Sequence, residues 1–274
     1  MPRVRLDALL AERGLFESRS RAAAAVIAGD VMLLPGRRRA DKPGQSVDPA
    51  VEVEVVAPPP FVSRGGIKLA NALDALDVAV AGRSAADVGA STGGFTDCLL
   101  QRGALRVAAV DVAYGELHWS LREDPRVTVL ERLNARALTA ADLPYAPDLL
   151  VMDVSFISVG KVLPAVLGCL APTFDALVMV KPQFEVGRER LGKGGVVRDV
   201  ELRREVVLDV ALAIQGAAVM GFVSSGLPGP KGNRETFVWL AEPGRPGALP
   251  DLDAVKFGET WDEGPSGGER SETI

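Results

Sequence analysis

Seven short apolar runs alternate with helix-like stretches between about residues 61 and 243, and this alternation constrains the fold more than any other feature. Most of the runs are almost continuously apolar, as is typical of strands that are buried on both faces of a sheet. Strands that alternate with helices predict an α/β fold with a parallel, doubly wound sheet. The predicted strands are AADVGA, RVAAVDVA, RVTVLE, DLLVMDVS, ALVMVKP, AAVMGFVSS and RETFVWLAE.

A smaller unit precedes this region. RLDALLAERG and RAAAAVIAG predict two short helices that end at Gly14 and Gly29, and VMLL and VEVEVV predict two strands. The proline-rich stretch APPP that follows predicts a stiff linker. We therefore expect a first domain over residues 1–58, a linker over 59–64, a second domain over 65–245, and an acidic, disordered tail over 246–274.

The charge is distributed unevenly. The net charge is −5, but Arg3–Lys42 holds nine Lys or Arg and five Asp or Glu, whereas Asp251–Ile274 holds two and seven. A basic head with an acidic tail favours a polyanionic partner, although a solvated surface would give the same count. No apolar run reaches the ~18 residues that span a bilayer, and the first residues lack a secretory signal. We expect a cytoplasmic protein in which Cys98 and Cys169 are reduced.

The segment DVGASTGGFTDCLL begins at the end of the first predicted strand of the large domain. Ligands of such a sheet bind outside the carboxyl ends of its strands, and glycines let the backbone approach them closely. The spacing G-A-S-T-G-G lacks the second glycine of the NAD-binding pattern. Asp87, before the loop, suits an ammonium better than a pyrophosphate, and Asp111, about twenty residues on, can receive two ribose hydroxyls. These features favour S-adenosylmethionine over NAD, and a glycine turn without a ligand is the alternative.

Four charged residues adjoin apolar segments of the large domain. Asp153 and Lys181 end two predicted strands, Glu235 begins another, and Lys68 follows the pliable stretch SRGG. Asp153 and Lys181 stand at the carboxyl ends of their strands, at the same edge of the sheet as the glycine loop. Each residue singly could be an ion pair at the border of the core, but the four together favour a reactive site.

DVGASTGGFTDCLL, VMDVSFIS, VMVKPQFE and SRGGIKL together resemble the TlyA family of ribosomal RNA 2′-O-methyltransferases, some of which are named haemolysin A. The second domain also resembles the broader FtsJ-like methyltransferases, which implies a Rossmann-like, seven-stranded methyltransferase sheet. The first residues, RLDALLAERGLFESRSRAAAAVIAGDVML, resemble the small α+β RNA-binding domain named after ribosomal protein S-four. The resemblance covers nearly the whole chain except the tail.

The resemblance implies roles for individual residues. It implies a catalytic tetrad of Lys68, Asp153, Lys181 and Glu235. It implies cofactor contacts from Asp87, Gly89, Ser91, Gly93, Asp111 and Asn134. It implies RNA contacts from Arg3, Arg5, Arg19, Arg21 and Lys42. No Cys/His spacing predicts a metal site, and His118, the only histidine, is expected on a helix surface or at the cofactor rim rather than as a base.

The implied function is the S-adenosylmethionine-dependent 2′-O-methylation of cytidine in 16S or 23S ribosomal RNA, or in both. The partners expected are ribosomal RNA and ribosomal subunits, without DNA or a membrane. The sequence does not fix the oligomeric state, and a monomer is favoured. Lys181 is the expected base, and burial together with the second cation Lys68 would favour its neutral form. The alternatives are an RNA-binding assembly factor without catalysis, a membrane-active haemolysin, and an NAD-dependent enzyme.

Overall fold

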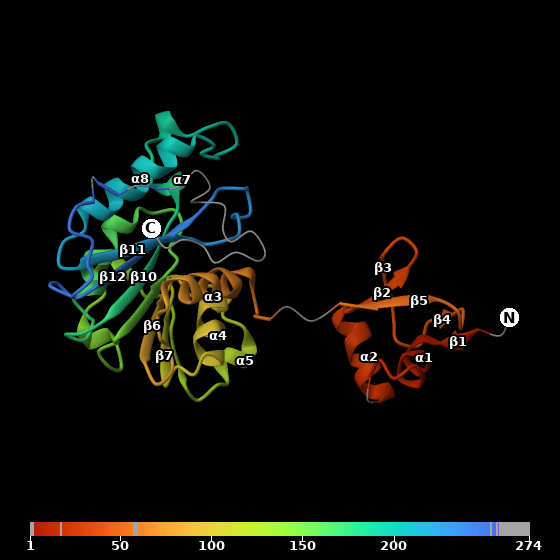
Figure 1. Ribbon diagram of the computed structural model, residues 1–274. Helices are drawn as coiled ribbons and strands as arrows, with labels where there is room; N and C mark the ends of the chain where they lie inside the picture. Colours follow the sequence, from red (N-terminus) through yellow and green to blue (C-terminus); the bar gives the residue numbers. More distant parts are fainter. Residues whose placement is uncertain (1–2, 17, 57–59, 253, 256, 258–274) are drawn as a thin grey trace. The chain divides into compact units, whose positions relative to one another are not determined.

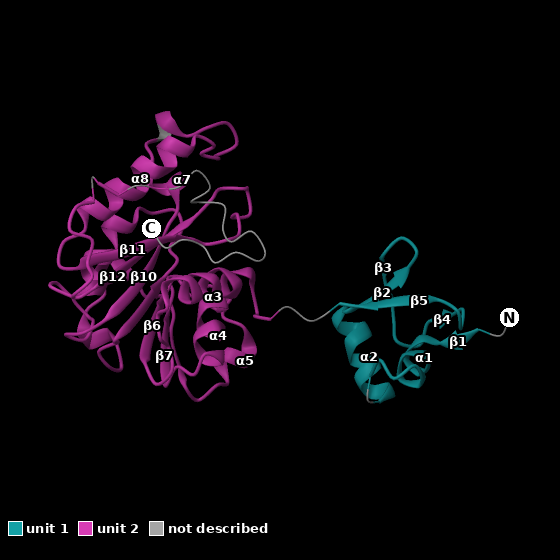
Figure 2. Ribbon diagram, in the orientation of Figure 1, with its two compact units in different colours: residues 1–59 teal, residues 60–274 magenta. Residues whose placement is uncertain are grey.

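The computed structural model describes residues 3–16, 18–56, 60–252, 254, 255 and 257. The chain forms two compact units, residues 1–59 and 60–274 (Figure 2), and each has a hydrophobic core of its own. The division falls at the proline-rich stretch, of which residues 57–59 lie outside the described residues. Phe61 and Val62, within the predicted linker, pack against the core of the second unit.

The first unit holds two helices and two small sheets. Helix α1 packs against α2, and Leu6, Leu10 and Val26 are buried between them and the strands. The Ser18 hydroxyl accepts a hydrogen bond from the backbone of Arg21 and so caps α2, which ends at Gly29 with a φ of 87°. The elements are β1 (Val4–Arg5), α1 (Leu6–Glu12), α2 (Arg19–Ala28), β2 (Val31–Leu34), β3 (Arg38–Arg39), β4 (Ser46–Val47) and β5 (Glu52–Val55).

The second unit is built on one seven-stranded sheet with the order β11-β12-β10-β9-β6-β7-β8. All seven strands predicted from the apolar runs are present. The strands are β6 (Ser84–Val88), β7 (Arg106–Val110), β8 (Val127–Leu130), β9 (Leu149–Met152), β10 (Asp175–Val180), β11 (Ala218–Ser224) and β12 (Thr236–Ala241). The chain runs from β6 outward to β8 and returns to β9 on the other side of β6, so the switch point lies between β6 and β9.

One strand departs from the predicted parallel sheet. β12 lies between β10 and β11 and runs antiparallel to both. The connection from β11 to β12 contains no helix, whereas a parallel return requires a crossover of a dozen or more residues that is usually helical. The antiparallel direction brings the first residue of β12, Thr236, beside the last residue of β10, Val180.

Helices cover both faces of this sheet (Figure 1). Leu69 and Leu73 of α3 and Leu99 of α4 are buried against one face, and Leu163 of α6 and Val207 of α8 are buried against the other. None of the helices in the described residues is long and apolar enough to cross a membrane. The helices are α3 (Arg64–Leu76), α4 (Gly94–Gln101), α5 (Trp119–Arg122), α6 (Leu163–Leu167), α7 (Pro182–Glu185) and α8 (Val200–Ala213), with short 3₁₀ turns η1 (Ala135–Ala137), η2 (Ala140–Asp142), η3 (Val159–Lys161) and η4 (Arg188–Arg190).

The first part of the predicted disordered tail packs on the second unit instead. The backbone N–H of Leu249 donates to the carbonyl of Val219 over 2.8 Å. Val255 is buried, and the ring of Phe257 lies 5.5 Å from that of Phe222. These apolar side chains pack the segment against the core of the second unit, which the charge pattern of the tail did not predict. The remainder of the predicted tail, residues 258–274, lies outside the described residues.

Candidate active site

Three of the four charged residues meet at one edge of the large sheet because of its topology. Asp153 directly follows β9 and Lys181 directly follows β10, and these strands are parallel neighbours. Glu235 directly precedes β12, which is antiparallel to β10, so it lies at the same edge. The reversal of β12 therefore explains how a residue that begins its strand joins residues that follow theirs.

Lys181 is held by two oxygen atoms. Its Nζ lies 2.5 Å from Oδ1 of Asp153 and donates a hydrogen bond of 2.8 Å to the hydroxyl of Ser155. The lysine is 8% exposed, whereas Ser155 is exposed. Sequence reasoning missed Ser155, although it stands two residues after Asp153 in the segment VMDVSFIS. The hydroxyl of the exposed Ser155 therefore fixes the direction of the buried amine of Lys181.

Lys68 and Glu235 form the second pair. Lys68, on α3, is 7% exposed and Glu235 is 3% exposed, and the Nζ donates to Oε2 of the carboxylate. Glu235 compensates the charge of Lys68, so Lys68 acts less strongly as a second cation on Lys181 than the sequence predicts. The four residues form two ion pairs at this edge of the sheet.

A cavity of about 520 Å³ opens beside Asp153, at the switch point of the sheet. Four of the six predicted cofactor residues line it, namely Gly89, Ser91, Asp111 and Asn134. The backbone N–H of Ser91 donates to Oδ2 of Asp111 over 2.7 Å, which joins the glycine loop to the end of β7. The cavity falls within the ~300–1,000 Å³ range of small-molecule sites.

Gly89 permits a close approach between the backbones that follow β6 and β9. Its φ is +87°, and a Cβ built on it would lie 2.6 Å from the carbonyl oxygen of Asp153. A side chain would therefore push the ends of β6 and β9 apart where they border the cavity. The glycine loop is shaped for close contact between backbones and for an adjoining ligand.

The other two predicted cofactor residues, Asp87 and Gly93, do not line the cavity. Asp87 is fully buried in β6, where its Oδ2 accepts from the backbone and the hydroxyl of Thr96 at 2.9 and 2.7 Å. Gly93 has a φ of +94°, and a Cβ there would lie 2.2 Å from a methyl of Leu121. We conclude that Gly93 lets α5 pack against the loop, a contact that the sequence pattern does not reveal.

Burial raises the pKa of Asp87 to about 7, and the nearby carboxylates of Asp153 and Asp111 add to the effect of desolvation, while hydrogen bonds from Thr96 oppose it. Its Oδ1 is buried and has no hydrogen-bond partner within the described part of the chain. A buried carboxyl with an unused oxygen near a cavity is suited to an electrostatic role toward a cation.

Asp87→Asn is expected to increase the free energy of unfolding at pH 8 and to change it little at pH 4. The folded pKa of Asp87, about 7, lies above its ordinary value of 3.8, so the folded state favours the protonated form. The stability from this shift is complete below pH 3.8 and is lost as the pH rises through about 7. Urea unfolding between pH 4 and 8.5 measures this, and parallel pH profiles for both proteins would contradict it.

Two residues around the cavity escaped sequence reasoning. Glu116 lines it, and its Oε2 accepts from the hydroxyl of Ser91 over 3.1 Å. Phe156 also lines it, is 91% exposed and has a φ of +65°. Its ring lies 5.3 Å from that of Phe184 on α7. A large exposed aromatic ring on the wall of the cavity offers a flat surface for a substrate.

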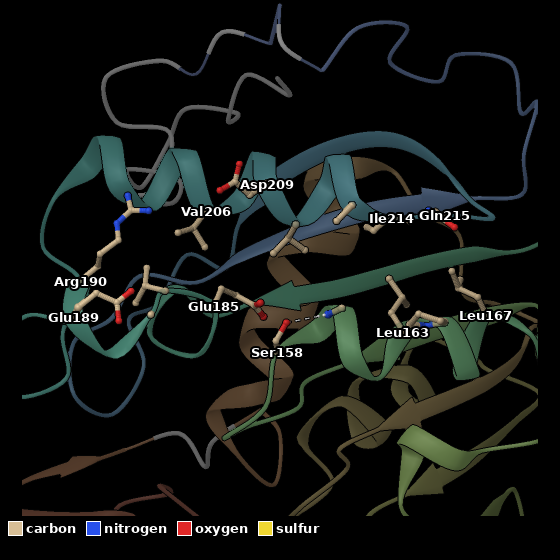
Figure 3. A pocket seen from close by; sticks show the side chains of 16 residues that line it. Ser158, Leu163, Leu167, Glu185, Glu189, Arg190, Val206, Asp209, Ile214 and Gln215 are labelled. Carbon is tan, nitrogen blue, oxygen red and sulfur yellow. Dashed lines mark hydrogen bonds between the residues drawn. The ribbon is translucent and has the colours of Figure 1, made fainter.

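A second cavity, of about 440 Å³, lies between α6 and α8 (Figure 3). Its walls are mostly apolar, with Val206 of α8 and Ile214, which directly follows α8, on one side and Leu163 of α6 on the other. The cavity contains no member of the two ion pairs and no residue of the glycine loop. Glu185, on its wall, accepts from the backbone of Val159, which stabilises the segment after Phe156. This cavity is separate from the cavity beside Asp153, with which it shares no lining residue.

The five predicted RNA-binding residues of the first unit, Arg3, Arg5, Arg19, Arg21 and Lys42, are all exposed. Arg5 and Arg19 converge on Asp7, with N–O distances of 2.8 and 3.2 Å. The Arg5 guanidinium, with help from Arg19, lowers the pKa of Asp7 to about 2. Asp7 is 4% exposed and was not predicted; it fixes the two guanidinium groups side by side.

The described residues contain no group of three or more His, Cys, Asp or Glu that could hold a metal ion.

Comparisons with known proteins support the same chemistry. Residues 61–242 match the family of FtsJ-like methyltransferases. A 16S/23S rRNA (cytidine-2′-O)-methyltransferase, TlyA, from Mycobacterium tuberculosis is 51% identical over 244 residues, which are 87% of this chain and 90% of that protein. The "putative rRNA methyltransferase YqxC" of Bacillus subtilis is 44% identical over 244 residues, 88% of this chain and 86% of that protein. A solved "putative hemolysin" of Streptococcus thermophilus, 40% identical, has a TM-score of 0.67 and covers 88% of this chain and 89% of its own.

Proposed function

The chain belongs to the TlyA family of FtsJ-like methyltransferases, and from this we propose that it transfers a methyl group from S-adenosylmethionine to the 2′-hydroxyl of cytidine in ribosomal RNA. The M. tuberculosis relative is named for that reaction on 16S and 23S rRNA. The observation that carries the proposal is the buried Nζ of Lys181, held by Asp153 and Ser155 at the edge of a cavity. A ribosomal substrate implies action in the cytoplasm.

The residues around the larger cavity fit this cofactor. Gly89 lines the cavity, and Asp111 keeps free acceptor sites because each of its oxygens accepts only one backbone N–H, from Ser91 and Ala113. Asp111 and Asn134 would hold the ribose and the adenine side, and the unused oxygen of Asp87 would favour the cationic methionine part. When bound, the cofactor supplies an activated methyl group on a sulfonium.

Lys181 prepares the attacking hydroxyl. A ribose 2′-hydroxyl is a weak nucleophile while it keeps its proton, and a positioned amine can remove that proton. Asp153 stabilises the ammonium that forms on Lys181, and Ser155 fixes the direction of the amine. Lys68 and Glu235 hold the opposite side of the site as a buried pair next to β10. The 2′-hydroxyl is present only in RNA, so the reacting group itself selects RNA over DNA.

The first unit would supply much of the RNA affinity. We assign to it the S-four-like RNA-binding role implied by its sequence. The support is that its five candidate basic residues are exposed and that Asp7 fixes Arg5 beside Arg19. Contacts to phosphates position RNA without reading its sequence and weaken as salt rises.

Ser155→Ala is expected to lower kcat about tenfold and to leave the KM for RNA unchanged, because a hydrogen bond to a charged group contributes roughly 1.5–3 kcal/mol. Ser155→Thr keeps the hydroxyl and is expected to restore most of the rate. Steady-state methylation assays with both variants test this. An equal loss in both variants would show that the hydroxyl does not position Lys181.

The proposed function is tested by mass spectrometry of ribosomal RNA. Ribosomal subunits from cells that lack this protein are incubated with purified protein and S-adenosylmethionine, digested to nucleosides and compared with untreated subunits. The expected product is 2′-O-methylcytidine. A methyl group on a base, or no new methylated nucleoside in either subunit or in free RNA, would overturn the proposal.

A further inference from the structure

Two loops of the second unit carry exposed basic residues, and they meet beside Glu235. The first, residues 191–199, connects η4 to α8 and contains Lys193 and Arg198; its one acidic residue, Asp199, caps the start of α8. The second, residues 225–235, connects β11 to β12, contains Lys231 and Arg234, and ends at Glu235, which pairs with Lys68. Lys193, Arg198 and Lys231 are exposed. Within the described part of the chain, no acidic side chain pairs with Lys193 or Lys231.

Asn233 ties these loops together. It is 3% exposed, its Oδ1 accepts from the backbone N–H of Val197, and its Nδ2 donates to the carbonyl of Gly195, both over 2.9 Å. Arg203, in the first turn of α8, donates to the carbonyl of Arg198 in the first loop over 2.7 Å. Because a buried amide satisfied on both sides fixes the backbones it joins, the basic side chains emerge from a defined surface.

A third segment joins this surface from the start of α3. The exposed side chain of Arg64 donates from Nη2 to the carbonyl of Pro228, in the second loop, over 2.9 Å. One helical turn later, α3 carries Lys68, which pairs with Glu235. We call Arg64, Lys193, Arg198 and Lys231 the basic rim. It borders the Lys68–Glu235 side of the site, whereas the cofactor cavity lies on the Asp153 side.

We propose that the basic rim binds phosphates of the RNA strand that carries the target nucleotide, independently of the basic residues of the first unit. This inference rests on the proposed function. Exposed Lys and Arg side chains without acidic partners attract phosphates, and such contacts set the position of a strand on the protein. The rim would hold the backbone next to the target ribose and so present its 2′-hydroxyl to Lys181.

The full-length variant Lys193→Gln/Lys231→Gln tests the rim, with Arg106→Gln/Arg126→Gln as the control. Arg106 begins β7 and Arg126 directly precedes β8, so the control removes two exposed charges from the opposite edge of the sheet. Affinity for a transcribed ribosomal RNA fragment is measured by fluorescence anisotropy without cofactor, from 50 to 300 mM salt. The affinity for S-adenosylmethionine is measured by calorimetry.

The rim variant is expected to bind RNA about tenfold more weakly at 150 mM salt, and its plot of log affinity against log salt should be shallower by about 1.4 units. The control and the affinity for S-adenosylmethionine should stay unchanged. Equal RNA affinity in the rim variant and the control would overturn the inference. Tighter RNA binding by the rim variant would also overturn it. Because binding is read without turnover, these outcomes do not depend on whether the ribose is methylated.

Discussion

Replacing Lys181 by alanine is expected to lower the kcat of methylation by about 10²–10⁴-fold, which is the usual contribution of a general acid or base. The affinity for S-adenosylmethionine should change little, because the side chain contacts Asp153 and Ser155 and is not part of the cavity wall. Single-turnover methylation of ribosomal subunits measures the rate, and calorimetry measures the cofactor affinity.

The variant Lys181→Arg tests whether Lys181 acts as a base or only as a fixed positive charge. Arginine keeps the cation and much of the reach but stays protonated at every accessible pH, so it cannot accept a proton. If Lys181 is the base, Lys181→Arg should be as slow as Lys181→Ala. A rate in Lys181→Arg within about threefold of the unchanged protein would assign Lys181 an electrostatic role instead. The exposed Lys161, replaced by alanine, serves as the matched control.

Glu235→Ala is expected to destabilise the second unit by about 3–5 kcal/mol, because it leaves the ammonium of Lys68 buried without its partner. Urea unfolding followed by tryptophan fluorescence measures this loss. All three tryptophans lie beyond residue 60, so the signal reports the second unit rather than the first. The expected effect is large because both side chains are less than one-tenth exposed.

The double variant Lys68→Met/Glu235→Leu removes the charges together. A buried ion pair that is replaced by apolar side chains of similar size often costs little stability, so this variant should recover most of the loss. It should remain inactive if the pair serves the reaction. Recovery of both stability and methylation would show that the pair is only structural, and failure to recover stability would show that the site cannot accept apolar side chains.

The strands of the large sheet could be predicted because the runs are apolar on both faces and end at charged residues. The direction of β12 could not be predicted from its own residues. Its direction depends on the connection over 225–235, whose glycines and prolines form a loop without a helix. A connection of this length without a helix favours an antiparallel return.

Pairing within the candidate site depended on long-range packing. Asp153 and Lys181 were expected at one edge because parallel strands share their carboxyl ends. The exclusive pairing of Lys68 with Glu235 is set by where α3 packs, which no local pattern encodes. Gly93 illustrates the same limit, since its conformation suits a cofactor loop but its lack of a side chain serves the contact with Leu121.

The ion pair between Lys68 and Glu235 joins residues 167 positions apart. During translation, Glu235 emerges from the ribosome only after the rest of the second unit's sheet, apart from β12, has been synthesised. A nascent chain that ends before Glu235 contains six of the seven strands, and Lys68 in it lacks its acidic partner. The site is therefore completed only after six of the seven strands have been synthesised, so chains that terminate before Glu235 should be unstable and without activity.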